Sequence, residues 1–116
     1  MNKDDQNKQQ PSLVPPEIVE AVARIRQYGI KKYKDPENWR TVEPQRYWEA
    51  ALRHTLAAWA DDKAIDPESG MPHVWHIACN LAFLIALEDG LNPKDIVSDS
   101  KSLHPESVSL SVAVRQ

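Results

Sequence analysis

Hydrophobic positions recur every three or four residues in three separate segments of the chain, which is the period of amphipathic α-helices. In the first segment Ile18, Val22 and Ile25 share one helical face. The three segments cover residues 15–29, 43–62 and 72–88. Alternation with a period of two, which would indicate strands, is weak before the C-terminal tail. The pattern therefore predicts an all-α fold, a small helical bundle with three main helices.

The first predicted helix has a clear start and an early end. Pro15 and Pro16 suit the beginning of a helix, since a helix start leaves backbone N–H groups without partners anyway. Gly29 is expected to break or bend the helical pattern, because glycine weakens a helix interior. Residues 31–39, which contain a proline, are therefore predicted to form a loop.

The third predicted helix is apolar on nearly every side. Residues 71–87 contain no Lys, Arg, Asp or Glu, so this helix should occupy the middle of the bundle. Gly90 is a typical residue for the end of such a helix. Residues 92–97 could add a short fourth helix.

Composition divides the chain into one folded domain and two polar ends. Residues 1–14 are predicted to be a disordered lead and residues 15–97 the helical domain. The tail, residues 98–116, is rich in serine and ends in an alternating stretch. This stretch could be a floppy tail, an edge strand or a partner-binding arm.

Charge and cysteine content exclude several classes of partner. The chain has 116 residues, a net charge of −3 and no block of basic residues, so a nucleic-acid duplex is not expected as a partner. The single cysteine, Cys79, can form neither an intrachain disulfide nor a cysteine-based zinc site, which suits a reducing cytoplasm. The polar N-terminus lacks the apolar stretch of a signal peptide, and residues 71–87 are expected to form a buried core helix rather than a membrane span.

Polar side chains interrupt the apolar third helix on one face. His73, His76 and Asn80 follow the spacing i, i+3 and i+7, and Leu84 and Leu87 continue the same stripe. Burying an unpaired polar group costs roughly 1–3 kcal/mol. These three side chains should therefore have partners, which could be water, a ligand, a metal ion or polar groups of the second helix.

Polar residues of the second helix and of the turn that follows it are candidates for these partners. Glu49, Arg53 and His54 lie on the second helix, and Asp66 and Glu68 lie in the turn. Antiparallel packing of the second and third helices would bring them to the mouth of one cleft. Carboxylates with imidazoles can hold Mg²⁺, Mn²⁺ or a similar ion. Arginine and lysine beside such an ion would suit a polyphosphate.

Each of these features also has a purely structural interpretation. Two imidazoles at i and i+3 are commonly satisfied core residues, and residues 66–70 are typical of a turn. Tryptophans usually fill a core, although Trp39 lies in a polar segment and could stack on a base. The residues alone leave open an enzyme, a non-catalytic nucleotide- or metal-binding module, and a structural bundle with a buried His–Asn network.

Three segments, taken together, resemble one family: Tyr28–Arg40, Tyr47–Trp59 and Asp66–Leu84. Their order is similar to that of a small phage-encoded domain described as a dATP/dGTP diphosphohydrolase, which is related to the MazG-like all-α nucleoside triphosphate pyrophosphohydrolases. The family pattern runs, loosely, G-A-x-K-Y, then N-W, then R-H, then D-x-E-S-G-x-x-H-x-x-H and a downstream Asn. The residues that meet it are Gly29, Lys32, Tyr33, Asn38, Trp39, Arg53, His54, Asp66, Glu68, Ser69, Gly70, His73, His76 and Asn80.

The resemblance implies metal-dependent hydrolysis of deoxypurine nucleoside triphosphates, dGTP or dATP, to the monophosphate. It also implies Mg²⁺ or Mn²⁺ as cofactor, a homo-oligomer, and a location in the cytoplasm of a bacterium or a phage-infected host. The expected metal ligands are His54, Asp66, Glu68, His73 and His76. The expected substrate-binding residues are Lys32, Asn38, Trp39, Arg53 and Asn80. The expected catalytic residues are Glu49, Arg53, His54, His73 and His76.

The chain departs from the acidic pattern of the wider superfamily, which places pairs of acids on adjacent helices. The second helix offers only Glu49 before Asp61 and Asp62 near its C-terminal end. The third helix carries His73 and His76 at the spacing where acids would be expected. Imidazoles in place of carboxylates would favour a softer ion such as Mn²⁺, Co²⁺ or Zn²⁺ over Mg²⁺.

Overall fold

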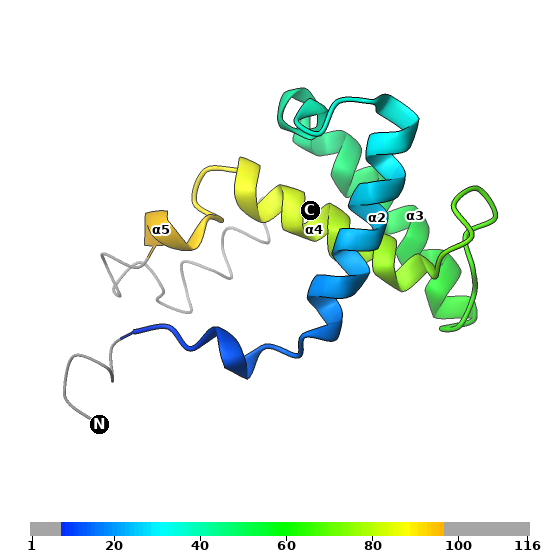
Figure 1. Cartoon of the computed structure of the whole chain (residues 1–116), viewed down its shortest axis with the longest axis horizontal. Coiled ribbons are helices and arrows are strands. Elements are labelled where there is room, and N and C mark those ends of the chain that lie inside the picture. The colour runs from blue at the N-terminus through cyan, green and yellow to red at the C-terminus, as the bar shows by residue number, and fades with distance from the viewer. Residues whose placement is uncertain (1–7, 97–116) are drawn as a thin grey trace.

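The computed structural model describes residues 8–96 (Figure 1). The regular elements among these residues are helices, apart from one isolated bridge. Three long helices, α2 (Glu17–Tyr33), α3 (Pro44–Ala60) and α4 (His73–Leu87), make up the domain. Three short helices complete it: η1 (Pro11–Leu13), η2 (Asn38–Thr41) and α5 (Pro93–Ile96). The predicted all-α class, with three main helices and a short fourth after the third, is confirmed.

Helix α4 occupies the middle of the domain, as its apolar sequence predicts. It packs against α3, α2 and η2, and α2 crosses it near its N-terminal half (Figure 1). The buried apolar side chains come from all three long helices: Ile25, Ala51, Cys79 and Leu84. The core of the described residues is therefore small, and several large apolar side chains remain on the surface.

The predicted break at Gly29 is wrong, because α2 continues for another turn to Tyr33. The helix ends at Lys34, whose φ of 64° places it in the left-handed region and whose N–H bonds Ile30 O at 2.6 Å. One glycine costs a helix only about 1 kcal/mol, so a single glycine need not end a helix. Lys32 consequently stands on a helix rather than in the predicted loop.

The turn between α3 and α4 is held by backbone hydrogen bonds. Asp66 N–H donates to Met71 O at 2.8 Å, and His73 N–H donates to Ala64 O at 3.1 Å. Gly70 has a φ of 74°, a left-handed conformation that glycine adopts without strain. The turn therefore fixes Asp66 beside the first residue of α4.

Parts of the predicted organisation lie outside the described residues. Residues 98–116, the predicted partner-binding arm, are among them, as are residues 1–7 of the predicted lead. Residues 8–14 include the short helix η1. No helix between residues 8 and 96 is long and apolar enough to cross a membrane.

Candidate functional site

A cavity of about 450 Å³ lies among α2, α3, α4 and the turn before α4. Its lining combines two imidazoles, three carboxylates, three cationic side chains and several aromatic rings. Tyr47 and His54 are seven residues apart on α3, and His76 and Phe83 are seven apart on α4, which separates each pair by roughly 10 Å. The cavity therefore has a histidine end and an aromatic end.

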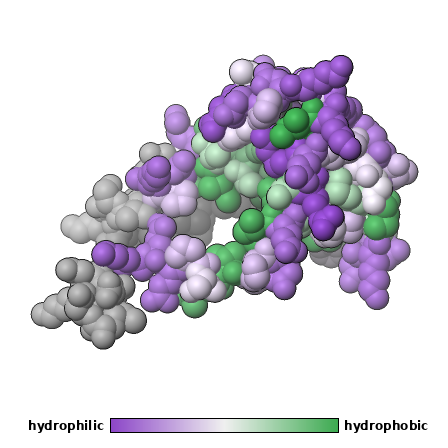
Figure 2. Space-filling model, viewed as in Figure 1, coloured by the Kyte–Doolittle hydropathy of each residue, from purple (hydrophilic) through white to green (hydrophobic). Residues whose placement is uncertain are grey.

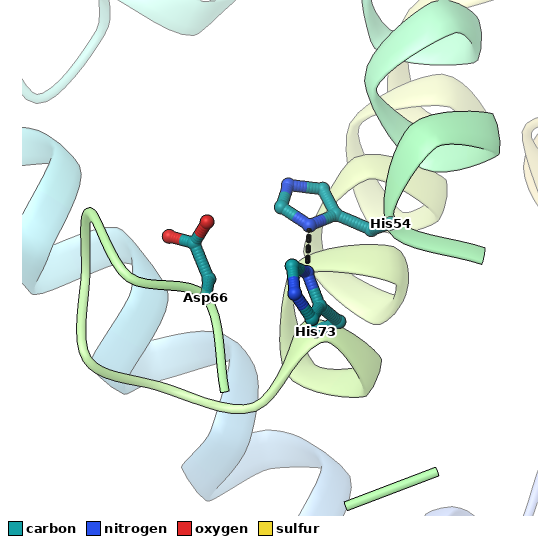
Figure 3. A group of neighbouring side chains, drawn as sticks. All are labelled: His54, Asp66 and His73. Carbon is teal, nitrogen blue, oxygen red and sulfur yellow. Dashed lines mark hydrogen bonds between the residues drawn. The ribbon is translucent and has the colours of Figure 1, made fainter. Parts of the chain in front are cut away.

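Three imidazoles meet at the histidine end. His54 Nδ1 and His73 Nδ1 share a hydrogen bond of 2.7 Å (Figure 3). The ring of His76 stacks on that of His54, with 4.4 Å between centroids and 7° between planes. The first two members of the α4 stripe, His73 and His76, thus contact His54 on α3.

The turn adds a carboxylate to these rings. Asp66 Oδ2 accepts the backbone N–H of Ser69 at 2.9 Å and lies 3.5 Å from His76 Nε2. The hydroxyl of Ser69 lies 2.7 Å from the same His76 nitrogen. His76 is therefore held by Ser69 and Asp66, while His54 and His73 are held by one another.

The electrostatics of this end favour neutral rings at His54 and His76 beside an ionised Asp66. Burial, reinforced by the neighbouring rings of His76 and His73, lowers the pKa of His54 to about 4. Burial also lowers the pKa of His76, although the nearby Asp66 opposes this change. Burial alone would raise the pKa of Asp66, but hydrogen bonds from Ser69 and the adjacent imidazoles lower it overall. Neutral imidazoles and carboxylates are the forms that bind metal ions.

Three of the five predicted metal ligands come together in one group. Each of His54, Asp66 and His73 offers a donor atom, and these atoms lie within 4.8 Å of one another (Figure 3). They come from α3, from the turn and from the start of α4. Two imidazoles and one carboxylate can coordinate one divalent ion, and they leave its other coordination positions open.

The fourth predicted ligand, Glu68, lies apart from this group. Its carboxylate accepts hydrogen bonds from Lys32 and, at 3.1 Å, from the hydroxyl of Tyr28. Lys32, predicted to bind phosphate, lines the cavity and is paired with Glu68 across it. Glu68 therefore ties the turn to α2, a contact between residues far apart in sequence.

The fifth predicted ligand, His76, lines the cavity but already uses its Nε2 for Ser69 and Asp66. Asn80, one turn further along α4, donates its side-chain N–H to His76 O at 2.8 Å, and it too lines the cavity. This bond leaves the Asn80 amide oxygen available to accept a hydrogen bond.

The aromatic end is closed by a packed cluster. Trp39 stacks on Phe83, with 4.9 Å between ring centroids and 14° between planes. Tyr47 packs on Phe83 and donates its hydroxyl to Trp39 O at 2.7 Å. The guanidinium of Arg40 lies 4.4 Å from the Trp39 ring centroid. Trp39, predicted as a platform for a base, thus stacks on Phe83, and the neighbouring Asn38 lines the cavity.

Glu49 and Arg53 are not brought to the cavity. Both side chains are exposed on α3 and neither lines the cavity, and Glu49 accepts a hydrogen bond from Gln45 at 3.1 Å. Consecutive helical residues point about 100° apart, so Arg53 faces solvent although His54 faces inward. Sequence proximity to a site residue is a poor guide on a helix.

Two arginines that sequence reasoning missed do line the cavity, Arg26 and Arg46. Arg26 lies 5.4 Å from the Phe83 ring centroid and donates to Pro36 O at 2.5 Å. Arg46 could have been found, because it precedes His54 by two steps of four residues, a row that shares one side of a helix. Arg26 lies within the predicted first helix, but its place at the cavity depends on how that helix packs on α4.

Fold and cavity define the class as an all-helical domain with a polar cavity whose side chains can hold a metal ion and an anion. A family model described as dATP/dGTP diphosphohydrolase, N-terminal, matches residues 1–95, and the chain belongs to this family. The resemblance seen in the sequence is thereby confirmed. No curated protein and no solved structure matched the chain. The description points to hydrolases that act on acid anhydrides, and it names an N-terminal domain.

Proposed function

We propose that this domain hydrolyses a deoxypurine nucleoside triphosphate, dGTP or dATP, to the monophosphate with the help of a divalent ion, Mg²⁺ or Mn²⁺. The observation that carries the proposal is the lining of the cavity. His54, Asp66 and His76 lie at one end, and the aromatic cluster around Phe83 lies at the other. A volume of about 450 Å³ is within the range of small-molecule sites. The family description supports the same substrate class.

The phosphates would bind on the side of the cavity that carries the cationic side chains. Lys32, Arg26 and Arg46 all line it. Guanidinium groups bind phosphate oxygens in a bidentate manner and keep their charge at any relevant pH. We assign the phosphates to these three residues, since Arg53 points to solvent. Their charge would stabilise the negative charge that develops as the anhydride bond breaks.

The metal ligands would be His54, Asp66 and His73. An ion bound there would supply charge neutralisation at the phosphate oxygens and acidify a water molecule. Water adds to one phosphorus, the bond from that phosphorus to the bridging oxygen breaks, and the bridging oxygen leaves with its electron pair. Attack at the α-phosphorus yields pyrophosphate, and attack at the outer phosphorus followed by a second cycle yields two phosphates. Both routes end at the monophosphate.

The nucleoside would lie toward the aromatic end. Asn38 and Asn80 line the cavity and offer amide groups to a base or sugar. The ring of Trp39 already stacks on Phe83, so we propose that it forms the wall of the base site together with Phe83. Base stacking on aromatic side chains contributes about 1–3 kcal/mol per base.

A product assay over the four deoxynucleoside triphosphates with Mg²⁺ and with Mn²⁺ tests the proposal. We expect release of dGMP or dAMP, and a loss of at least about 100-fold in kcat/KM for His73→Ala. Arg46→Gln should lower kcat/KM more than Arg53→Gln, the matched change on the exposed side of the same helix. Absence of turnover with every nucleotide and both metals would contradict the proposal.

A non-catalytic nucleotide-binding module is the second candidate. It is favoured by one observation: Glu49, the only acid of α3 proper, faces away from the cavity. No acid of α3 therefore lines the cavity. Nucleotide-dependent thermal stabilisation without product would identify this alternative.

A further inference from the structure

The group formed by His54, Asp66 and His73 has an unusual donor set for an enzyme that handles phosphate with Mg²⁺. We infer that this group is a transition-metal site that selects Co²⁺, Zn²⁺ or Mn²⁺ over Mg²⁺, with His76 and Ser69 as its outer support. The inference deepens the proposed function. It rests on that function only where it assigns this ion to the hydrolysis of the nucleotide. Binding of the ion can be measured without any nucleotide.

Donor chemistry carries the first step. Mg²⁺ prefers oxygen ligands in near-octahedral geometry and gives up its water reluctantly. Two of the three donors here are imidazole nitrogens. Imidazole suits Zn²⁺, Co²⁺ and similar ions, and affinity for nitrogen donors rises along the first transition series from Mn²⁺ to Cu²⁺. A site with two imidazoles and one carboxylate therefore discriminates against Mg²⁺.

Geometry carries the second step. The two Nδ1 atoms of His54 and His73 are 2.7 Å apart. Two nitrogens bound to one ion at about 2.0–2.1 Å lie about 3.0–3.4 Å apart for ordinary coordination angles. The two Nδ1 atoms therefore need to move apart by less than about 1 Å to bind one ion between them. One of the two Nδ1 atoms carries the proton of this hydrogen bond. If that proton moves to Nε2 of the same ring, the lone pairs of both Nδ1 atoms are free to bind an ion.

The surroundings of the group carry the third step. His76 stacks on His54 and lies next to Asp66, and Ser69 bonds both Asp66 and His76. Hydrogen bonds of this kind hold metal ligands in position, and their loss typically costs 10–100-fold in affinity. His76 is accordingly a positioning residue, whereas Glu68 is bound to Lys32 and Tyr28 and takes no part.

The test uses the full, untagged chain after treatment with a chelator, and calorimetric titration with Mg²⁺, Mn²⁺, Co²⁺ and Zn²⁺ separately. We expect Co²⁺ and Zn²⁺ to bind at least about 100-fold more tightly than Mg²⁺. His54→Gln, His73→Gln and Asp66→Asn should each weaken Co²⁺ binding by more than about 100-fold, and His76→Gln by about tenfold. Glu68→Gln should leave the affinity within about twofold. His104→Gln, which removes an imidazole outside the described residues, is the matched control.

A second measurement guards against variants that misfold. Co²⁺ shifts the proton resonances of the imidazoles that bind it, so the loaded protein should show two exchangeable imidazole N–H signals outside the normal range. His104→Gln should keep both signals. Circular dichroism establishes that each variant is helical. Mg²⁺ that binds as tightly as Co²⁺, or Co²⁺ affinity indifferent to His54→Gln and His73→Gln, would overturn the inference.

The two proposals fail in different ways. Tight Co²⁺ binding that depends on His54 and His73, without turnover of any nucleotide, would support the metal site and contradict the hydrolase. Turnover of dGTP or dATP with Mg²⁺ by a chain that lacks selective Co²⁺ binding would support the hydrolase and contradict the metal site.

Discussion

The α3–α4 pair has two faces. The face toward the cavity carries polar side chains, whereas the opposite face exposes apolar ones. Toward the cavity the pair presents His54, His76 and Asn80. On the other side it exposes Leu52, Leu56 and Trp59 of α3 together with Val74, Leu81 and Ile85 of α4. At 100° per residue both stripes lie roughly opposite the cavity-lining positions of their helices. We call these six residues the outer face.

The two faces differ in whether their side chains find partners within one chain. Every buried side-chain nitrogen or oxygen in the described residues has a hydrogen-bond partner, so the polar inner face is complete within one chain. The outer face is incomplete, because Trp59 remains 87% exposed and Leu56 73% exposed. Hydrophobic surface also interrupts the hydrophilic one on the face drawn in Figure 2. Large contiguous apolar patches usually mark an interaction surface.

The largest expected effect compares two leucines of the same helical pair. Leu84 is 1% exposed in the last turn of α4, whereas Leu56 is 73% exposed on the outer face of α3. Leu84→Ala should lower the free energy of unfolding by about 2–5 kcal/mol, because it leaves a cavity. Leu56→Ala should change it by less than about 0.5 kcal/mol in dilute protein. Urea unfolding at low protein concentration measures both values, and equal losses would mean that the two faces are not distinct.

The next prediction concerns self-association. We expect a second copy of the chain to cover the outer face, because the core of one copy is small and the exposed stripes are apolar on two neighbouring helices. Leu56→Glu should weaken association by about tenfold or more, since it places a charge within the apolar face. Analytical ultracentrifugation over a range of concentrations measures the dissociation constant.

Ala23→Glu is the control for this change, because it adds the same charge to an exposed position of α2. The control variant should associate as the parent chain does. A parent chain that stays monomeric at all concentrations, or equal weakening in both variants, would contradict the assignment of the outer face.

Helical periodicity was sufficient to predict the architecture, because hydrophobic spacing reports which side of a helix is covered. It located α3 and α4, placed His76 and Asn80 at the cavity, and placed His73 within reach of His54 on α3. It failed at Gly29, where α2 continues to Tyr33 despite the low helix propensity of glycine. Periodicity therefore predicts faces well and helix ends less well.

The site was predictable only as a set of residues, because pairing depends on tertiary packing. The contact between Lys32 and Glu68 spans 36 residues, and no local pattern indicates it. The same is true of the division of the five predicted ligands into the three that form the candidate metal group and two, Glu68 and His76, that are bonded elsewhere. Arg53 was assigned by its place beside His54 in sequence, which rotation about the helix axis separates.

A smaller effect concerns acid. In the chelator-treated protein the folded-state pKa of His54 is about 4, below its ordinary value of 6.5. The unfolded chain therefore takes up a proton first, so stability is fully present above about pH 6.5 and declines as the pH falls toward 4. We expect a loss of about 1–2 kcal/mol between pH 7 and pH 5, after allowance for solvent screening of this half-buried ring. Urea unfolding at a series of pH values measures it.

His54→Gln should flatten this decline, because it removes the group whose pKa differs between the two states. His104→Gln is again the control, and it should retain the slope of the parent chain. A parent chain whose stability rises on acidification from pH 7 to pH 5 would show that the inner face favours charged imidazoles, contrary to the burial described.

The smallest expected effect lies at the edge of the inner face, where Lys32 and Tyr28 hold Glu68. The side chains of Lys32 and Glu68 are 42% and 62% exposed, so their ion pair contributes little to folding. Lys32→Gln should lower the free energy of unfolding only slightly, and less still at high salt.

Lys31→Gln removes the same charge one position earlier on α2 and is the matched control. If Lys32 also binds phosphate, Lys32→Gln should raise KM for the nucleotide while Lys31→Gln leaves it unchanged. A small change in stability with a large change in KM would assign Lys32 to the substrate, whereas a change in stability alone would leave it as a tie between α2 and the turn. In the second case Lys32 would have a structural role only, and the phosphates would be assigned to Arg26 and Arg46 alone.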